Sequence, residues 1–294
     1  MAPRRWHTWL AAIGSLLLAG CQSAFFTALK APNAGQDVQR ERIEFSATPK
    51  LALDVYRPPG PRGTAPTVLF LYGGSWQNGK RGWYQFVGKA LAARGLVVAI
   101  PDYRKSPQVS FPTFVEDAAT AMAYVHTHID RFGGDPARLY LIGHSAGAHI
   151  AGLLATDARY LGVHGLKPGQ LRGVALLSGP LDFLPMTSPA IIRVFNGDAR
   201  NAQSQPINFV DGDEPPTLLL HGGDDGVVYP HNSENLHRAL AAHGVPSTLK
   251  IYPGVGHMGV VLAFSKGLRG IAPVLQDVLA WIDHTPAPSS PPSG

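Results

Sequence analysis

The 294-residue chain contains a single cysteine, Cys21, which excludes an internal disulfide and a Cys/His framework for structural zinc. It also lacks the His-Glu-x-x-His pattern of zinc hydrolases, and we expect no metal or other cofactor. No basic run is interleaved with aromatic residues, so the sequence predicts no nucleic-acid partner. Charged residues make up only 15% of the chain and hydrophobic residues 45%, which is typical of a globular protein with a large core.

The N-terminus has the character of an export signal. Arg4 and Arg5 precede an apolar stretch at 9–19, which is short for a membrane span. The stretch ends in Leu-Ala-Gly-Cys at 18–21, which resembles a bacterial lipobox. That resemblance implies cleavage after residue 20 and lipid on Cys21, although a plain signal or an uncleaved anchor helix remains open.

The resemblance to a lipoprotein signal also implies a location. Gln22 follows the cysteine, where an aspartate would suggest retention at the inner membrane. We therefore expect an exported bacterial lipoprotein at the outer membrane, facing the periplasm or the cell surface. Several acyl chains would give stable anchoring, whereas one chain binds a membrane only marginally.

Strand and helix patterns alternate between residues 41 and 283. Two strands near 42–47 and 51–58 are followed by continuous apolar runs, which are typical of parallel strands covered on both faces. The alternation predicts one α/β domain at 41–283, with a mostly parallel sheet and helices on both faces. Residues 1–20 are expected to be the signal, 21–40 a tether and the Pro/Ser-rich residues 284–294 a disordered tail. Helices are expected at 83–93, 113–132, 146–155, 233–243, 260–269 and 272–283.

One short motif carries the chemistry. Gly-His-Ser-Ala-Gly at 143–147 follows an apolar strand and precedes a helix, which is the nucleophile-elbow pattern. Glycines at both flanks remove side chains that would collide in so sharp a turn. The motif places Ser145 at the carboxyl end of a strand, where sites gather in parallel sheets. The helix start next to it favours a developing negative charge.

A nucleophilic serine needs a base and an acid that orients the base. His257 lies in a glycine-rich loop after the last predicted strand, and we expect it to be the base. Residues 217–228 offer carboxylates just past another buried strand, at Asp224 and Asp225, and Asp182 follows an earlier strand. The order serine, acid, histidine is that of an α/β-hydrolase.

Several motifs in order carry a family resemblance. They are LYGGSW at 71–76, PDYR at 101–104, the stretch 133–151 around the serine, LSGPLDF at 177–183, PPTLLLHGGDDGVV at 215–228 and YPGVGH at 252–257. Together they resemble the α/β-hydrolase carboxylesterases, in particular the prenylcysteine-methylesterase-like and hormone-sensitive-lipase-like groups. The resemblance covers about residues 40–283 and is far more specific for the fold than for the substrate.

The resemblance implies further site residues. It makes Asp225 the acid, ahead of Asp224 and Asp182. It also implies an oxyanion hole formed by the backbone N–H groups of Gly74, Ser75 and Ala146. Relatives have His-Gly-Gly in this loop, and here Tyr72 replaces the histidine, so the bracing of the loop must differ. Asp102 and Arg104 of the PDYR motif are expected to form a structural ion pair or loop anchor.

The sequence therefore predicts a serine esterase that works through an acyl-enzyme. Only about 36 residues separate the strands near 178 and 215, so any cap is small and short-to-medium acyl esters or small alcohol groups are favoured. Three alternatives stay open: an arylformamidase-like amide hydrolase, a carbohydrate-ester deesterase and a non-catalytic envelope lipoprotein. The expected partners are a small-molecule ester and, through the N-terminal lipid, a membrane; the oligomeric state stays open.

Overall fold

The computed structural model describes Phe26, Leu29, residues 37–60 and residues 63–285. The predicted signal, Cys21 and all but two residues of the predicted tail lie outside the described residues. Phe26 and Leu29, from the predicted tether, are buried against the domain, and the Phe26 ring stacks on Trp83 with 5.1 Å between centroids. Part of that tether therefore packs on the domain.

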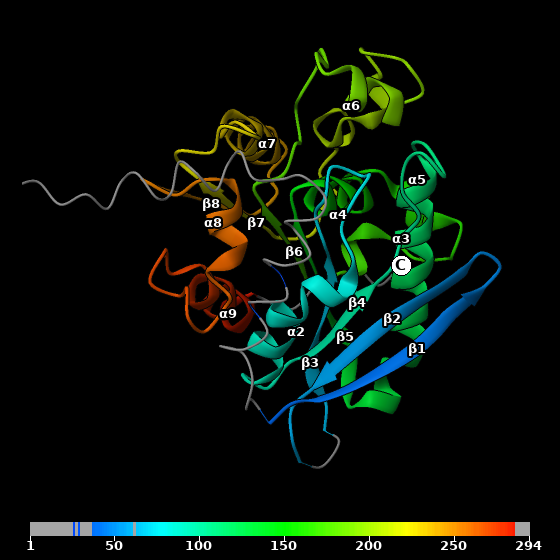
Figure 1. Ribbon diagram of the computed structural model, residues 1–294, viewed down its shortest axis with the longest axis vertical. Coiled ribbons are helices and arrows are strands. Elements are labelled where there is room, and N and C mark those ends of the chain that lie inside the picture. Colours follow the sequence, from blue (N-terminus) through cyan, green and yellow to red (C-terminus); the bar gives the residue numbers. More distant parts are fainter. Residues whose placement is uncertain (1–25, 27–28, 30–36, 61–62, 286–294) are drawn as a thin grey trace, which may run out of the picture.

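A central sheet of eight strands organises the domain, in the order β1-β2-β4-β3-β5-β6-β7-β8 (Figure 1). The first two strands form an antiparallel hairpin, and β2 pairs with β4 antiparallel. All further pairs are parallel. The predicted α/β fold with a mostly parallel sheet is confirmed. The strands are β1 (Gln39–Ala47), β2 (Lys50–Arg57), β3 (Ala65–Leu71), β4 (Val97–Pro101), β5 (Gly134–His144), β6 (Gly173–Leu177), β7 (Thr217–Gly222) and β8 (Ser247–Tyr252).

Helices cover both faces of the sheet, with α2 and α9 on one side and α3 and α4 on the other (Figure 1). Strands β4 and β6 are buried along their whole length, as continuous apolar runs require in a covered parallel sheet. The α-helices are α2 (Gln85–Ala92), α3 (Thr113–His128), α4 (Ala146–Thr156), α5 (Ala158–Gly162), α6 (Pro189–Val194), α7 (His231–Ala242), α8 (His257–Leu262) and α9 (Val274–His284). Short 3-10 helices are η1 (Arg81–Trp83), η2 (Ile129–Phe132), η3 (Pro168–Gln170), η4 (Ala202–Ser204) and η5 (Pro206–Phe209).

One predicted helix is wrong in its bounds. The apolar pattern at 260–269 predicted a helix there, but α8 begins at His257 and ends at Leu262. The residues that follow include Gly267 and Gly270, and glycine is a poor helix former because it loses much backbone freedom on folding. The early start places His257 at the first turn of α8, directly after the loop that follows β8.

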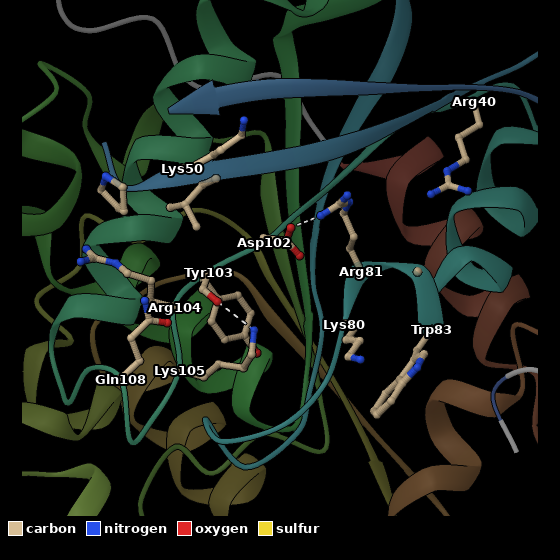
Figure 2. A pocket seen from close by; sticks show the side chains of 13 residues that line it. Arg40, Lys50, Lys80, Arg81, Trp83, Asp102, Tyr103, Arg104, Lys105 and Gln108 are labelled. Atoms are coloured by element: carbon tan, nitrogen blue, oxygen red, sulfur yellow. Dashed lines mark hydrogen bonds and ion pairs between the residues drawn. The ribbon is translucent and has the colours of Figure 1, made fainter. Parts of the chain in front are cut away.

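The expected pair between Asp102 and Arg104 does not form. Arg104 instead makes a bidentate ion pair with Asp117 of α3. Asp102 pairs with Arg81 (Figure 2). Both pairs anchor the loop after β4 to neighbouring elements. The expectation of a loop anchor is therefore confirmed, with different partners.

The cap is the segment 180–214 between β6 and β7, where the sequence predicted at most a small cap. It carries α6, η4 and η5, and α6 stands at the top of Figure 1 beyond α4 and α5. Aromatic packing joins the cap to the domain, since Phe195 of the cap meets the Trp76 ring edge-on at 5.0 Å. No helix in the described ranges has the length and apolar character needed to cross a membrane.

Candidate active site

Ser145 sits in the sharp turn between β5 and α4, with φ 55° and ψ −123°. Such a conformation is rare for an L-residue and costs on the order of 1–3 kcal/mol, so the surroundings must enforce it. A Cβ on Gly143 would lie 2.3 Å from the Gly147 carbonyl oxygen, and one on Gly147 would lie 2.1 Å from the Leu71 carbonyl oxygen. Both glycines are therefore required by close backbone packing.

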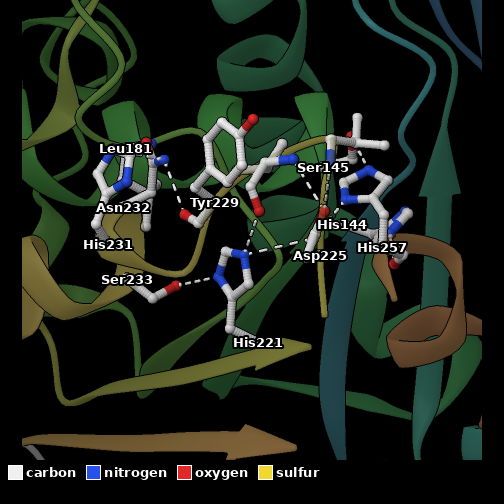
Figure 3. Close-up of polar contacts among 12 residues, drawn as sticks. His144, Ser145, Leu181, His221, Asp225, Tyr229, His231, Asn232, Ser233 and His257 are labelled. Carbon is white, nitrogen blue, oxygen red and sulfur yellow. Dashed lines mark hydrogen bonds and ion pairs between the residues drawn. The ribbon is translucent and has the colours of Figure 1, made fainter. Parts of the chain in front are cut away.

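Three predicted site residues meet at this turn (Figure 3). His257 Nε2 lies 2.9 Å from Ser145 Oγ, and His257 Nδ1 lies 2.8 Å from Asp225 Oδ2. A carboxylate only accepts hydrogen bonds, so Nδ1 carries the proton and Nε2 accepts from the serine hydroxyl. The serine comes from β5–α4, the aspartate from the loop after β7 and the histidine from the start of α8.

Asp225 is held in a buried cradle. Its Oδ1 accepts from the N–H groups of Val227 and Val228, both at 2.9 Å, and only 2% of the residue is exposed. Burial alone would raise the pKa of Asp225, but hydrogen bonds from His221 and His257, the charge of His257 and the Val228 N–H outweigh burial. The pKa lies well below its usual range, and the carboxylate stays ionised beside the imidazole.

The two rejected carboxylates point elsewhere. Asp224 is exposed, and its Oδ1 accepts from the Gly254 N–H at 3.3 Å. Asp182 accepts from the Asn235 side chain. Among the three candidates, Asp225 is the one that hydrogen-bonds His257.

His221 braces the loop after β7, which carries Asp225. Its Nε2–H donates to the Val228 carbonyl at 2.8 Å and lies 3.4 Å from Asp225 Oδ2, while Nδ1 accepts from Ser233 Oγ at 2.7 Å (Figure 3). The imidazole thereby ties the loop after β7 to α7. Ser233 was missed by sequence reasoning, because nothing in a helical serine indicates that it contacts a histidine twelve residues earlier.

The glycine loop after β3 lies directly against Ser145. A Cβ on Gly73 would approach Ser145 Cβ to 2.9 Å, so this glycine, missed in the sequence, is needed for close approach. Gly74 and Ser75 follow with φ of 136° and 53°. Among the backbone–backbone hydrogen bonds of the loops and turns in the described part of the chain, none has the N–H of Gly74, Ser75 or Ala146 as its donor.

Two buried histidines pack around the site. His149 of α4 is 0% exposed; its Nδ1 accepts from Trp76 Nε1 at 3.1 Å, and its Nε2–H donates to the Ser204 carbonyl at 2.7 Å. It thus joins the glycine loop to the cap. His144 lies beneath the turn, with its ring 5.1 Å from that of His257. No group of three or more His, Cys, Asp or Glu side chains within the described residues is arranged to hold a metal ion.

A sheet of this order, with a nucleophile elbow after β5 and its partners on later loops, defines an α/β-hydrolase fold. The BD-FAE family model matches residues 53–240, more than half of the chain, and the chain belongs to that family.

Solved structures agree on the fold. Esterase B from Lactobacillus rhamnosis has a TM-score of 0.74 at 24% identity, covering 93% of this chain and 95% of that chain. A truncated carbohydrate esterase from gut microbiota has a TM-score of 0.71 at 20% identity, covering 86% and 98%.

Sequence relatives are named as esterases. The isoprenylcysteine alpha-carbonyl methylesterase of Arabidopsis thaliana is 30% identical over 83% of this chain and 62% of that protein. An esterase of Mycobacterium tuberculosis is 29% identical over 75% of this chain and 60% of that protein. The chain thus spans about three fifths of the length of the curated relatives it matches.

The buried histidines predict how stability depends on pH. Burial lowers the pKa of His149 to about 4, so the folded state keeps it neutral, whereas the unfolded chain protonates it below about pH 6.5. The free energy of unfolding should therefore fall as pH drops from about 6.5 towards 4, by about 1.4 kcal/mol per pH unit for this histidine. Burial, followed by repulsion from His257, lowers the pKa of His144 to about 3, which adds a slope of the same sign.

Urea unfolding of His149→Gln across this pH range tests the assignment. The number of protons taken up on unfolding should fall by about one relative to the unsubstituted protein. His164→Gln, at an exposed position, serves as the control. An unchanged pH dependence in His149→Gln contradicts the assignment.

Proposed function

We propose that the protein is a serine hydrolase of carboxylic esters, with Ser145 as nucleophile, His257 as general base and acid, and Asp225 as the orienting acid. The observation that carries the proposal is the continuous chain of hydrogen bonds at 2.9 and 2.8 Å from Ser145 Oγ through His257 to Asp225. Names of relatives support ester hydrolysis as the reaction class.

The geometry supports acyl transfer to water in two steps. Ser145 Oγ attacks the ester carbonyl while His257 Nε2 takes the hydroxyl proton, and the imidazolium that forms is stabilised by Asp225. The N–H groups of Gly74, Ser75 and Ala146, which donate to no backbone carbonyl in the loops and turns of the described residues, donate to the oxyanion. His257 then protonates the leaving alcohol, and in the second step it activates the water that releases the acid from Ser145.

The substrate proposed is an ester with a short-to-medium acyl chain or a small alcohol. Support comes from the small cap, in which two aromatic side chains pack against the Trp76 ring. Phe195 contacts Trp76, and Phe183 stacks on Trp76 at 6.0 Å. The methylesterase name of the Arabidopsis relative agrees with a small leaving alcohol.

Substitution of Ser145 tests the nucleophile. Ser145→Ala should lower kcat for p-nitrophenyl acetate by on the order of 10⁴- to 10⁶-fold, because the nucleophilic route is lost. It should also abolish covalent labelling by a fluorophosphonate probe. Ser46→Ala, at a serine of β1 outside the site, is the control and should still be labelled. Full labelling of Ser145→Ala would refute the proposal, and a wild-type protein that is neither labelled nor active would favour a non-catalytic lipoprotein.

The two neighbouring aspartates provide a matched pair for the acid. Asp225→Asn should lower kcat by about 10⁴-fold, since the amide favours the wrong histidine tautomer. Asp224→Asn should change it by less than about tenfold, because Asp224 is exposed and accepts from the Gly254 N–H, not from His257. Steady-state kinetics on both variants, with circular dichroism to check folding, decide the assignment, and the reverse order of effects moves the role to Asp224.

A series of p-nitrophenyl esters tests the acyl range. We expect kcat/KM to be greatest at short-to-medium acyl chains, since the cap is a short segment between β6 and β7. A maximum at the longest chains contradicts this. N-formylkynurenine and acetylated or feruloylated polysaccharide, assayed beside the series, test the amide hydrolase and carbohydrate-ester alternatives directly.

We also propose that the protein is a lipoprotein anchored through Cys21 and exported to the outer membrane. The motif Leu-Ala-Gly-Cys at 18–21 carries this proposal. Cells fed radioactive palmitate should yield labelled wild-type protein and unlabelled Cys21→Ala. Absence of label on the wild type would remove the anchor, and fractionation of the envelope would then locate the protein independently.

A further inference from the structure

A cavity lies away from the serine. It has a volume of about 810 Å³, and neither Ser145 nor His257 lines it. Its walls come from the β1–β2 hairpin, the segment 80–83 and the loop 102–108 that follows β4 (Figure 2). Ligand sites in proteins commonly have volumes of about 300–1,000 Å³, so this cavity has room for a small organic molecule.

Positive charge dominates the walls of this cavity. Six cationic side chains line it, against the single carboxylate of Asp102. The cations are Arg40, Lys50, Lys80, Arg81, Arg104 and Lys105. Clustering of this kind is costly unless carboxylates or a bound anion compensate it.

Four carboxylates compensate part of this charge. Asp54, fully buried, lies 2.8 Å from Arg40 and 3.2 Å from Arg81. Asp102 pairs with Arg81, Asp117 with Arg104, and Glu44 with Lys50. Within the described residues, Lys80 and Lys105 have no carboxylate in an ion pair. Six cations against four carboxylates leave an excess of two positive charges.

Lys105 is held in place by neutral groups. Its Nζ donates to Tyr72 Oη at 3.1 Å and to the Tyr103 carbonyl at 3.0 Å, and it lies over both tyrosine rings. Burial lowers the pKa of Lys105, the charge of Asp117 raises it, and repulsion from Lys80, the smallest of the three effects, lowers it. An anion between the two lysines would remove this repulsion.

The cavity also has an aromatic wall. Lys80 Nζ lies 5.8 Å from the Trp83 ring centroid, and Phe26 stacks on Trp83 with the two rings nearly parallel. Tryptophan beside cationic groups suits a ligand with both an anionic group and a flat or apolar part.

We propose that this cavity is an anion-binding site that takes the phosphate monoester group of a small ligand between Lys80 and Lys105. A phosphate monoester carries close to two negative charges at neutral pH and has three acceptor oxygens, which match the two uncompensated lysines. A single carboxylate would leave one of them unmatched. The site is separate from the serine, so the proposal stands whether or not the protein hydrolyses esters.

Calorimetric titration of the full chain with phenyl phosphate tests the site. We expect saturable one-to-one binding that is weakened about tenfold in Lys80→Gln and in Lys105→Met, because each removes a charge-assisted hydrogen bond. Lys167→Gln, an exposed lysine elsewhere, should bind like the wild type. Lys80 is itself exposed, so its variant should fold normally, which thermal unfolding would check.

Further arms separate the possible sources of the phosphate. Binding of phenyl phosphate or glycerol phosphate supports a soluble ligand, whereas binding only to vesicles that contain phosphatidate, reduced in Lys80→Gln, assigns the same chemistry to a lipid headgroup. Benzoate, which offers a single carboxylate on the same ring, should bind more weakly than phenyl phosphate. The proposal is overturned if neither source binds, if benzoate binds as well as phenyl phosphate, or if both lysine variants bind like the wild type.

Discussion

Ser145 holds a backbone conformation that L-residues rarely adopt, and the site depends on the packing that forces it to do so. The turn fits only because the backbone at Gly147 passes close to the Leu71 carbonyl of β3 and the backbone at Gly143 passes close to Gly147. The Ser145 N–H donates to the Leu177 carbonyl of β6 at 2.9 Å, which fixes the turn to a third strand. The strain at one residue is thus distributed over β3, β5 and β6, the middle of the sheet.

The same constraint determines where the partners of the serine can stand. Parallel strands end at one edge of the sheet, so the loops after β7 and β8 reach the turn without crossing the domain. Asp225 is both buried and ionised. A buried charge is stable here because backbone N–H groups and two histidines interact with its carboxylate oxygens. His221, tied to Ser233 of α7, keeps that loop from turning outwards. Orientation of His257 therefore rests on several contacts in addition to the aspartate.

Much of this arrangement was predictable from sequence because its causes are local. Each predictive feature reflects what its own segment needs in order to fold. These features are the two glycines around the serine, the apolar runs of the strands and the glycine-rich loop before His257. Partner choices between distant segments were not predictable. Arg104 lies two residues from Asp102 yet pairs with Asp117, and Trp76 finds His149 seventy-three residues away. Such pairings depend on the positions that the loops take up against the sheet. No local sequence pattern determines those positions.

Tyr72 replaces the histidine that relatives have at the start of the glycine loop, and the loop after β4 holds it in place. The Tyr72 carbonyl accepts from Tyr103 Oη at 2.6 Å, and its own hydroxyl accepts from Lys105. The two rings stack at 4.6 Å, and a Cβ on Gly79 would strike the Tyr72 ring, so the loop closes over this side chain. A loop held at the backbone and the side chain of its first residue has little freedom to move its N–H groups. Lys105 also lines the cationic cavity. The same side chain therefore contributes charge to the cavity and holds the glycine loop in position through Tyr72.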